Sequence, residues 1–382
     1  MMNNNVNPLA LAMFQSKYQP VALAHQKELK RLTITELLEQ FESIQRNKGK
    51  SEKAIREFRF CTELLQELTG AKYPDDIDYP CAVNYASGLS VYPKNRKRIP
   101  ELANTEGYEA IHLGFKLGKK TLSPARCLKI VQINSSFMKF SMKMSQVTQN
   151  VFSGLMTKRE VVSTRRKPFS DTHLNSIYHM RDYINHSYLH PYYFWIPLLL
   201  RYLGARLNEL CGLHASNIVQ IDNIPSVVIN DDIEGQRVKN NNSIRVIPIH
   251  SELIRLGFLE FVESKSGSRL FPELPLVNGY YSHNASNWFA RRRAQLKLGK
   301  GLDCYSFRHR LITELRENDI SFPTIMSIAG HITSGEEKRL GDWYKSPTNQ
   351  AYSHPLHPSV THPVIESIDS SHTQHIRPYY ER

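Results

Sequence analysis

A charged pair follows the most apolar stretch of the sequence. The run Tyr193–Leu200 is hydrophobic throughout and predicts a buried helix, and Arg206 comes shortly after it within Gly204–Leu213. An unpaired charge in a protein interior is costly, so a buried Arg is usually ion-paired or used for function. Glu209 lies three residues later, on the same face of a helix. At this point both a structural ion pair and a functional cation fit the pattern.

Three more segments of the same half carry residues that could do chemistry. They are Lys239 on a turn between two predicted strands, Tyr305–His309 at the start of an amphipathic helix, and Ala329–His331 followed by Tyr344. Each has an ordinary structural explanation, since a hairpin lysine is usually solvated and a residue after Gly often ends a helix. Together, in this order and at these spacings, the segments indicate one shared site.

The order of these segments resembles that of the tyrosine recombinases, the phage-integrase family of enzymes that break and rejoin DNA. The similarity covers residues 166–352, and its most specific parts are Gly204–Leu210 and Ser306–His309. The helical region before residue 166 resembles the family's core-binding domain in position and helix content. The resemblance implies a mainly α fold with a small antiparallel β-sheet, an α+β arrangement. It places a helical core-binding domain before an integrase-like catalytic domain.

The resemblance also implies a role for each residue. By this resemblance, Arg206 and Arg308 clamp the scissile phosphate, and Glu209 supports that clamp. Lys239 protonates the leaving 5′-hydroxyl, and His331 assists near the phosphate. Tyr344 is the nucleophile. These residue types suit phosphodiester transfer. Guanidinium groups bind phosphate oxygens in fork geometry, tyrosine can form a covalent phosphotyrosine, and an ammonium can protonate a departing hydroxyl. No metal or cofactor is expected, because the sequence has no P-loop and no carboxylate cluster of the two-metal type.

The sequence departs from the family pattern at two places. Tyr305 stands where most members carry His; its hydroxyl can donate a hydrogen bond to a phosphate but is a poorer base at neutral pH. The interval His331–Tyr344 spans 13 residues, longer than is usual in the family. Tyr352 therefore stays open as an alternative nucleophile. Because the strands around Lys239 are inferred, Arg237 stays open as an alternative hairpin cation.

Composition indicates a globular protein with a polyanionic partner. Of 382 residues, 41% are hydrophobic and 22% charged, and no apolar stretch approaches the ~20 residues needed to cross a bilayer. The net charge is +13, and residues 1–165 hold 25 of the 49 Lys and Arg but only 15 of the 36 Asp and Glu. Such a basic N-terminal half favours nucleic acid as partner. The five cysteines are scattered and without CxxC spacing, which is typical of a reducing cytoplasm.

Composition and periodicity also predict the domain organisation. We expect a flexible lead-in at residues 1–30, a helical domain at 31–155, a linker at 156–168, a catalytic domain at 169–352 and a mostly disordered tail at 353–382. Helices are predicted from Thr33, Ser51, Pro74, Ser123 and Ser170, and over 252–262, 286–298, 306–317 and 322–328. Two short strands are predicted at 225–230 and 243–249. The tail histidines His354, His357, His362, His372 and His375 fit no metal motif and are expected to be solvated.

The predicted partner is double-stranded DNA. The basic residues expected to neutralise phosphates are Lys94, Arg96, Lys97, Arg98, Arg165, Arg166, Lys167, Arg291, Arg292 and Arg293. The resemblance implies a homo-oligomer, a tetramer on paired sites, working in the bacterial nucleoid or a phage-infected host, with no membrane and no small-molecule substrate.

The leading hypothesis is a site-specific recombinase or integrase. Two alternatives stay open: a non-catalytic DNA-binding regulator that keeps the fold, and a type IB topoisomerase, which shares the chemistry. A pure binder needs no nucleophile, so the full set of two Arg, Lys, His and Tyr favours the enzyme.

Overall fold

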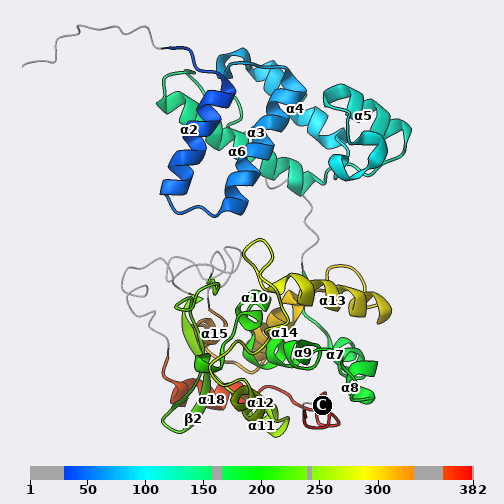
Figure 1. The fold of residues 1–382 in the computed structure, drawn as a ribbon, viewed down its shortest axis with the longest axis vertical. Helices are drawn as coiled ribbons and strands as arrows, with labels where there is room; N and C mark the ends of the chain where they lie inside the picture. The colour runs from blue at the N-terminus through cyan, green and yellow to red at the C-terminus, as the bar shows by residue number, and fades with distance from the viewer. Residues whose placement is uncertain (1–29, 157–165, 239–242, 331–355, 381–382) are drawn as a thin grey trace, which may run out of the picture. The chain divides into compact units, whose positions relative to one another are not determined.

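The chain forms two compact units, residues 1–163 and 164–382. The structure, a computed structural model, describes residues 30–156, 166–238, 243–330 and 356–380 (Figure 1). The boundary between the units lies inside the segment 156–168. Lys239, His331, Tyr344, Tyr352, Arg165, His354 and almost all of the lead-in lie outside the described residues.

The N-terminal unit is helical. Its α-helices are α2 (Ile34–Asn47), α3 (Glu52–Thr69), α4 (Tyr79–Val91), α5 (Gly107–Lys116) and α6 (Pro124–Lys143). Thr33 caps α2 in a capping box with Glu36, and the side chains of Ser51 and Ser123 cap α3 and α6. Helix α3 contacts α2, α4, α5 and α6, so it runs through the core of this unit (Figure 1). The helices predicted to begin at Thr33, Ser51 and Ser123 therefore do begin there.

The C-terminal unit is built around one apolar helix. Its helices are α7 (Asp171–Tyr178), α8 (Arg181–Ile184), α9 (Pro191–Leu203), α10 (Leu207–Cys211), α11 (Ser251–Arg255), α12 (Phe258–Ser264), α13 (Ser282–Gln295), α14 (Tyr305–Glu317), α15 (Phe322–Ala329) and α18 (Pro358–Glu366). Helix α9 is buried along almost its whole length and contacts α8, α10, α11, α13 and α14. The apolar run Tyr193–Leu200 is thus the central packing element, and it carries the chain directly to Arg206.

A three-stranded antiparallel sheet lies beside these helices. Its strands are β1 (Ile218–Ile221), β2 (Ile224–Ile229) and β3 (Arg245–Pro248), in the order β1-β2-β3. Val227 pairs with Ile247 in the register of β2 and β3, and both side chains are buried in the main core. Helices α15 and α18 contact β3. The predicted class, mainly α with a small antiparallel sheet, is confirmed.

Several elements differ from the sequence prediction. The single helix expected over 252–262 is split into α11 and α12, because Gly257 adopts a positive φ of 87° between them. The helix predicted from Pro74 begins at Tyr79 instead and is capped by Asp78. Helices α5 and α8 and strand β1 were not predicted. Strand β1 and helix α8 have four residues each, too few for a periodic pattern, whereas α5 does have a helical apolar period that the prediction missed.

The expectation of a disordered tail is wrong for residues 356–380. Helix α18 lies there, and Ile365, Ile368 and Ile376 are buried in the core of the unit. Ile365 and Ile368 have the three-residue spacing of a helix, but the many Pro, Ser and His residues around them masked this signal in the sequence. His372 is also buried and lies 3.4 Å from Asp171.

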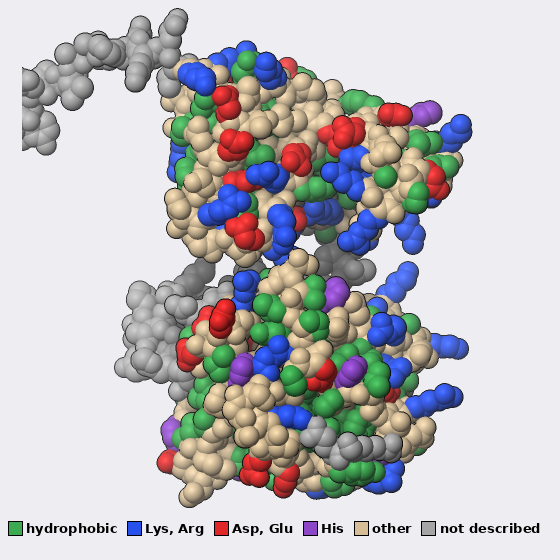
Figure 2. All heavy atoms as spheres, in the orientation of Figure 1, with side chains coloured by type: hydrophobic (Ala, Val, Ile, Leu, Met, Phe, Trp, Pro, Cys, Tyr) green, Lys and Arg blue, Asp and Glu red, His purple; other side chains and the backbone are tan. Residues whose placement is uncertain are grey.

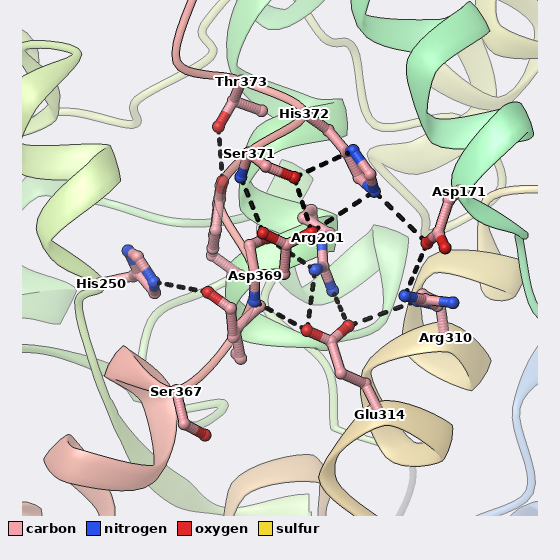
Figure 3. A network of polar contacts seen from close by, with 12 residues as sticks. Asp171, Arg201, His250, Arg310, Glu314, Ser367, Asp369, Ser371, His372 and Thr373 are labelled. Carbon is pink, nitrogen blue, oxygen red and sulfur yellow. Dashed lines mark hydrogen bonds and ion pairs between the residues drawn. The ribbon is translucent and has the colours of Figure 1, made fainter. Parts of the chain in front are cut away.

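A polar network fastens this tail, which we define as residues 356–380, to the body of the unit (Figure 3). Glu314 accepts hydrogen bonds from Arg201 at 2.8 and 3.1 Å and from the backbone N–H of Asp369 at 2.7 Å. Arg201 also donates to the carbonyl of Asp369 at 2.8 Å. His375 lies with Nε2 3.0 Å from the carbonyl of Tyr178. The solvated state expected for the tail histidines therefore does not hold for His372, and His375 contacts the body of the unit.

Among the described residues, no helix combines the length and apolarity that a membrane span requires.

Candidate active site

Arg206 is both paired and accessible. It is the N-cap residue of α10, and Glu209 accepts hydrogen bonds from its backbone N–H at 2.9 Å and from Nη1 at 2.7 Å. Nη1 also donates to Oγ of Ser243 at 3.1 Å. The side chain of Arg206 is 17% exposed to solvent, whereas that of Glu209 is 2% exposed. The ion pair considered from the sequence exists, and part of the Arg206 side chain stays exposed beside it.

Arg308 lies in the first turn of α14 and is almost fully buried. Its Nη1 donates to the carbonyl of Gly204 at 2.7 Å, and its Nη2 donates to the carbonyl of Gly330 at 2.8 Å. Both glycines have positive φ, 57° and 65°, and each ends a helix, α9 and α15 respectively. Arg308 therefore joins the turn that leads to Arg206 with the turn that leads to His331.

A third arginine, Arg245 at the start of β3, belongs to the same cluster. Its Nη2 donates to Oε2 of Glu209 at 2.9 Å, and both side chains are 2% exposed. Sequence reasoning missed this residue. Its only signal was a charge within the predicted strand 243–249, a position that packs inward in the folded unit.

Counted over the described residues alone, the cluster holds more positive than negative charge. Burial, followed by the proximity of Arg245 and Arg206, lowers the pKa of Arg308 to about 10. Burial alone would raise the pKa of Glu209, but Arg245 and Arg206 hold it below its usual value. Within the described part of the chain, two guanidinium groups are thus paired with the Glu209 carboxylate and a third, that of Arg308, lies near them. An anion bound here would relieve their mutual repulsion.

Tyr305 begins α14, one turn before Arg308. Its ring packs edge-on against that of His309, with centroids 4.8 Å apart, and the Arg166 guanidinium lies 5.1 Å from the ring centroid. Tyr305 and Arg308 are three residues apart in α14, a spacing that puts their side chains on the same face of the helix. Tyr305 is thereby placed beside the arginine cluster.

Two described residues that adjoin undescribed segments, Ser243 and Gly330, also lie at this cluster. Ser243, which follows the segment containing Lys239, contacts Arg206, and Gly330, which precedes His331, contacts Arg308. The structure gives no position for Lys239, His331, Tyr344 or Tyr352. Arg237 is exposed, and its guanidinium lies 5.8 Å from the Tyr280 ring.

The basic loop of the N-terminal unit divides into two kinds of residue. Lys94, Lys97 and Arg98 are exposed and border a hollow of about 460 Å³. Arg96 is buried instead; it is ion-paired with Glu67 at 3.2 Å and donates to the carbonyl of Thr105. Arg96 is thus part of the interior of this unit.

The basic residues of the C-terminal unit differ in exposure. Lys167, Arg291 and Arg166 are exposed, and Arg166 is also ion-paired with Asp303 at 3.0 Å. Arg292 and Arg293 are half-buried: Arg292 is ion-paired with Asp182 at 2.8 Å, and Arg293 donates to the carbonyl of Leu302. In the view of Figure 2, Lys and Arg side chains occur on both units, interspersed with Asp and Glu.

Comparison with solved structures places this architecture. A lambda integrase dimer bound to a COC′ core site matches with a TM-score of 0.53 and 16% identity, over 93% of this chain and 85% of that one. A lambda integrase tetramer bound to a Holliday junction matches with a TM-score of 0.54 and 16% identity, over 88% and 90% of the two chains. The chain has an integrase fold.

A second integrase structure supports the same fold. The Tn1549 transposon integrase in complex with a circular intermediate DNA matches with a TM-score of 0.55 and 14% identity, over 87% of this chain and 99% of that one. No protein-family model matches the chain, and no curated protein matches it by sequence. The resemblance inferred from the motifs is therefore confirmed at the level of the integrase fold.

Proposed function

We propose that the protein is a site-specific DNA recombinase or integrase that cuts and rejoins duplex DNA through a covalent 3′-phosphotyrosine. The observation that carries this proposal is the cluster of Arg206, Arg308 and Arg245 near Glu209, within an integrase fold. Among the described residues this cluster has more arginines than carboxylates, and the Arg206 side chain is partly exposed, which suits a phosphate diester.

In the proposed reaction, Arg206 and Arg308 bind the non-bridging oxygens of the scissile phosphate and offset the charge that grows in the transition state. The Tyr344 hydroxyl loses its proton to water, and its oxygen forms a bond to phosphorus while the bond from phosphorus to the 5′ oxygen breaks. Lys239 gives its proton to the departing 5′ oxygen, which leaves as the 5′-hydroxyl, and His331 assists near the phosphate. Rejoining reverses these steps: a 5′-hydroxyl attacks the phosphotyrosine and releases the tyrosine.

Two features of the cluster favour this chemistry. Arg308 is buried and held by two backbone carbonyls, so it adds positive charge to the cluster from a fixed position. Direct contact of Arg308 with a phosphate oxygen requires an N–H that does not bind these carbonyls, or release of one of the two. Arg206 is held through Glu209 but stays partly exposed, which suits direct contact with a phosphate oxygen.

The remaining basic residues would anchor the DNA backbone. Exposure favours Lys94, Lys97 and Arg98 in the N-terminal unit, and Lys167 and Arg291 in the C-terminal unit. Arg96 is better suited to a structural role, because burial and its ion pair with Glu67 keep it from the surface. Strand exchange between two duplexes needs several active subunits, so we propose a homo-oligomer, a tetramer on paired sites. It would act in the bacterial nucleoid or a phage-infected host.

Covalent trapping tests the proposal. A pool of nicked duplexes with a randomised core is incubated with the full-length protein, covalent complexes are recovered after denaturation, and the captured strands are sequenced. We expect a covalent complex enriched for one DNA sequence. Binding without any covalent complex would instead support a non-catalytic DNA-binding regulator. A complex without sequence preference, together with relaxation of supercoiled plasmid, would support a type IB topoisomerase.

A further inference from the structure

Arg245 holds together three segments that meet at the arginine cluster. Its Nη2 donates to Oε2 of Glu209, its Nη1 to the carbonyl of Ser243 at 2.7 Å, and its Nε to the carbonyl of Ile328 at 2.9 Å. These acceptors belong to α10, to the end of the β2–β3 connection and to the last turn of α15. One buried side chain therefore ties a helix, a hairpin and a helix end to each other.

Each of the three segments leads to a residue of the proposed reaction. Glu209 holds Arg206 through its other carboxylate oxygen. The β2–β3 connection contains Lys239, and Ile328 lies three residues before His331. Arg245 is thus linked to the supports of three reacting groups, although it is itself fully enclosed.

Two further contacts show how closely this arrangement is packed. A Cβ atom added to Gly330 would lie 3.1 Å from Nη1 of Arg245, so the guanidinium fills the space beside the turn that precedes His331. Arg308 binds the carbonyl of Gly330, two residues beyond the carbonyl that Arg245 binds. The C-terminal end of α15, where helix carbonyls carry partial negative charge, therefore faces two arginines.

We infer that Arg245 is a positioning residue of the active site: it does not touch the scissile phosphate, but it sets the placement of Arg206 through Glu209 and fixes Ser243 and Ile328, to which it donates hydrogen bonds. This inference rests on the proposed function. A lysine could keep the charge but not the three directions of the planar guanidinium fork. Misplacement of reacting groups by about 1 Å can cost about 100-fold in rate, so the loss should appear in catalysis rather than in binding.

The test compares Arg245→Lys with Arg201→Lys, a matched change at a second buried, ion-paired arginine of the same unit that lies in the tail network (Figure 3). With the DNA sequence recovered by covalent trapping, three quantities are measured for the full-length proteins: melting temperature, DNA dissociation constant, and single-turnover rate of covalent complex formation at saturating DNA. We expect Arg245→Lys to bind DNA within about threefold of the wild type and to react at least about 10-fold more slowly. We expect Arg201→Lys to melt at a lower temperature but to react at the wild-type rate.

Two outcomes would overturn the inference while leaving the proposed function intact. One is a wild-type rate in folded Arg245→Lys. The other is an equal loss of rate in both variants at an equal loss of melting temperature, which would mean a merely structural role. If the wild type forms no covalent complex on any DNA, the proposed function fails, and the role of Arg245 in it fails as well.

A second variant keeps the test decisive if Arg245→Lys does not fold. The substitution Arg245→Gln removes the charge but keeps an amide donor, and Glu209 retains Arg206 as its counter-ion. We expect this variant to bind DNA like the wild type and to react at least about 10-fold more slowly. A folded Arg245→Gln protein with the wild-type rate would contradict the positioning role.

Discussion

The Nη2 atom of Arg308 donates a hydrogen bond to the carbonyl oxygen of Gly330 at 2.8 Å. Gly330 adopts φ 65° and ψ 171°, a conformation that is essentially restricted to glycine. The residue that anchors one arm of the proposed phosphate clamp thus lies immediately before His331. The position of the Arg308 guanidinium therefore depends on the conformation of the turn at Gly330.

Replacing Gly330 by alanine should destabilise the C-terminal unit. The new Cβ would be strained by the positive φ and would lie 3.1 Å from the Arg245 guanidinium. We expect a loss of about 2–3 kcal/mol in the free energy of unfolding, measured by urea denaturation. Gly267→Ala is the control, since Gly267 has a similar φ of 71° but nothing within 4 Å of the added atom. The control should lose only about 1 kcal/mol, and an equal loss in both variants would argue against the close packing at Gly330.

Glu209 should make the stability of the C-terminal unit sensitive to acid. Arg245 and Arg206 hold its pKa below the usual 4.5 against the opposing effect of burial. A carboxylate with a lowered folded pKa stabilises the protein above its unfolded pKa and loses that contribution as the pH falls through the folded pKa. The stability difference between the wild type and Glu209→Gln should therefore be largest near neutral pH and shrink below about pH 4.5. A difference in melting temperature that stays constant between pH 7 and pH 3 would contradict this.

Glu314 should control how firmly the tail is held. Its carboxylate balances the buried Arg201 and accepts from the backbone of Asp369 (Figure 3). In Glu314→Gln a buried guanidinium loses its counter-charge, a change that typically costs about 3–5 kcal/mol. We expect faster hydrogen exchange of the backbone amide of Asp369 in this variant, measured by mass spectrometry of peptides from the tail. His362→Ala, which removes only a 3.5 Å surface contact with Glu366, should leave this exchange rate unchanged.

The basic loop of the N-terminal unit should contribute to DNA binding through its exposed residues. If Lys94, Lys97 and Arg98 each neutralise one phosphate, changing all three to alanine lowers the slope of log K against log salt by about 0.9 per contact. Filter binding over a range of salt concentrations measures this slope. Arg96→Met is the contrasting variant, because Arg96 is buried against Glu67. Arg96→Met should lower the melting temperature and keep the wild-type slope. A lower slope in Arg96→Met, together with an unchanged slope in the triple variant, would contradict this division of the loop.

Local patterns predicted the helices and the Arg206–Glu209 pair because these features depend on residues close in sequence. The cap at Thr33, the apolar run that became α9 and the three-residue spacing of the pair are of this kind. Arg245 and the ordered tail could not be predicted in the same way. Arg245 contacts Glu209 and Ile328, which are separated from it by 36 and 83 positions in the sequence. Glu314 contacts Asp369 across 55 positions. Likewise, a basic pentapeptide does not reveal that its Arg96 points inward.

The most direct test of the proposed function is to identify the amino acid that becomes bonded to DNA. The covalent complex is digested with protease and nuclease, and the peptide that carries the nucleotide is sequenced by mass spectrometry. We predict a 3′-phosphotyrosine at Tyr344, abolished in Tyr344→Phe with DNA binding retained. A bond at Tyr352 would move the nucleophile and keep the reaction. A Tyr344→Phe protein that still forms the complex elsewhere than on tyrosine, or a wild type that forms none on the DNA it binds, would contradict the proposed reaction.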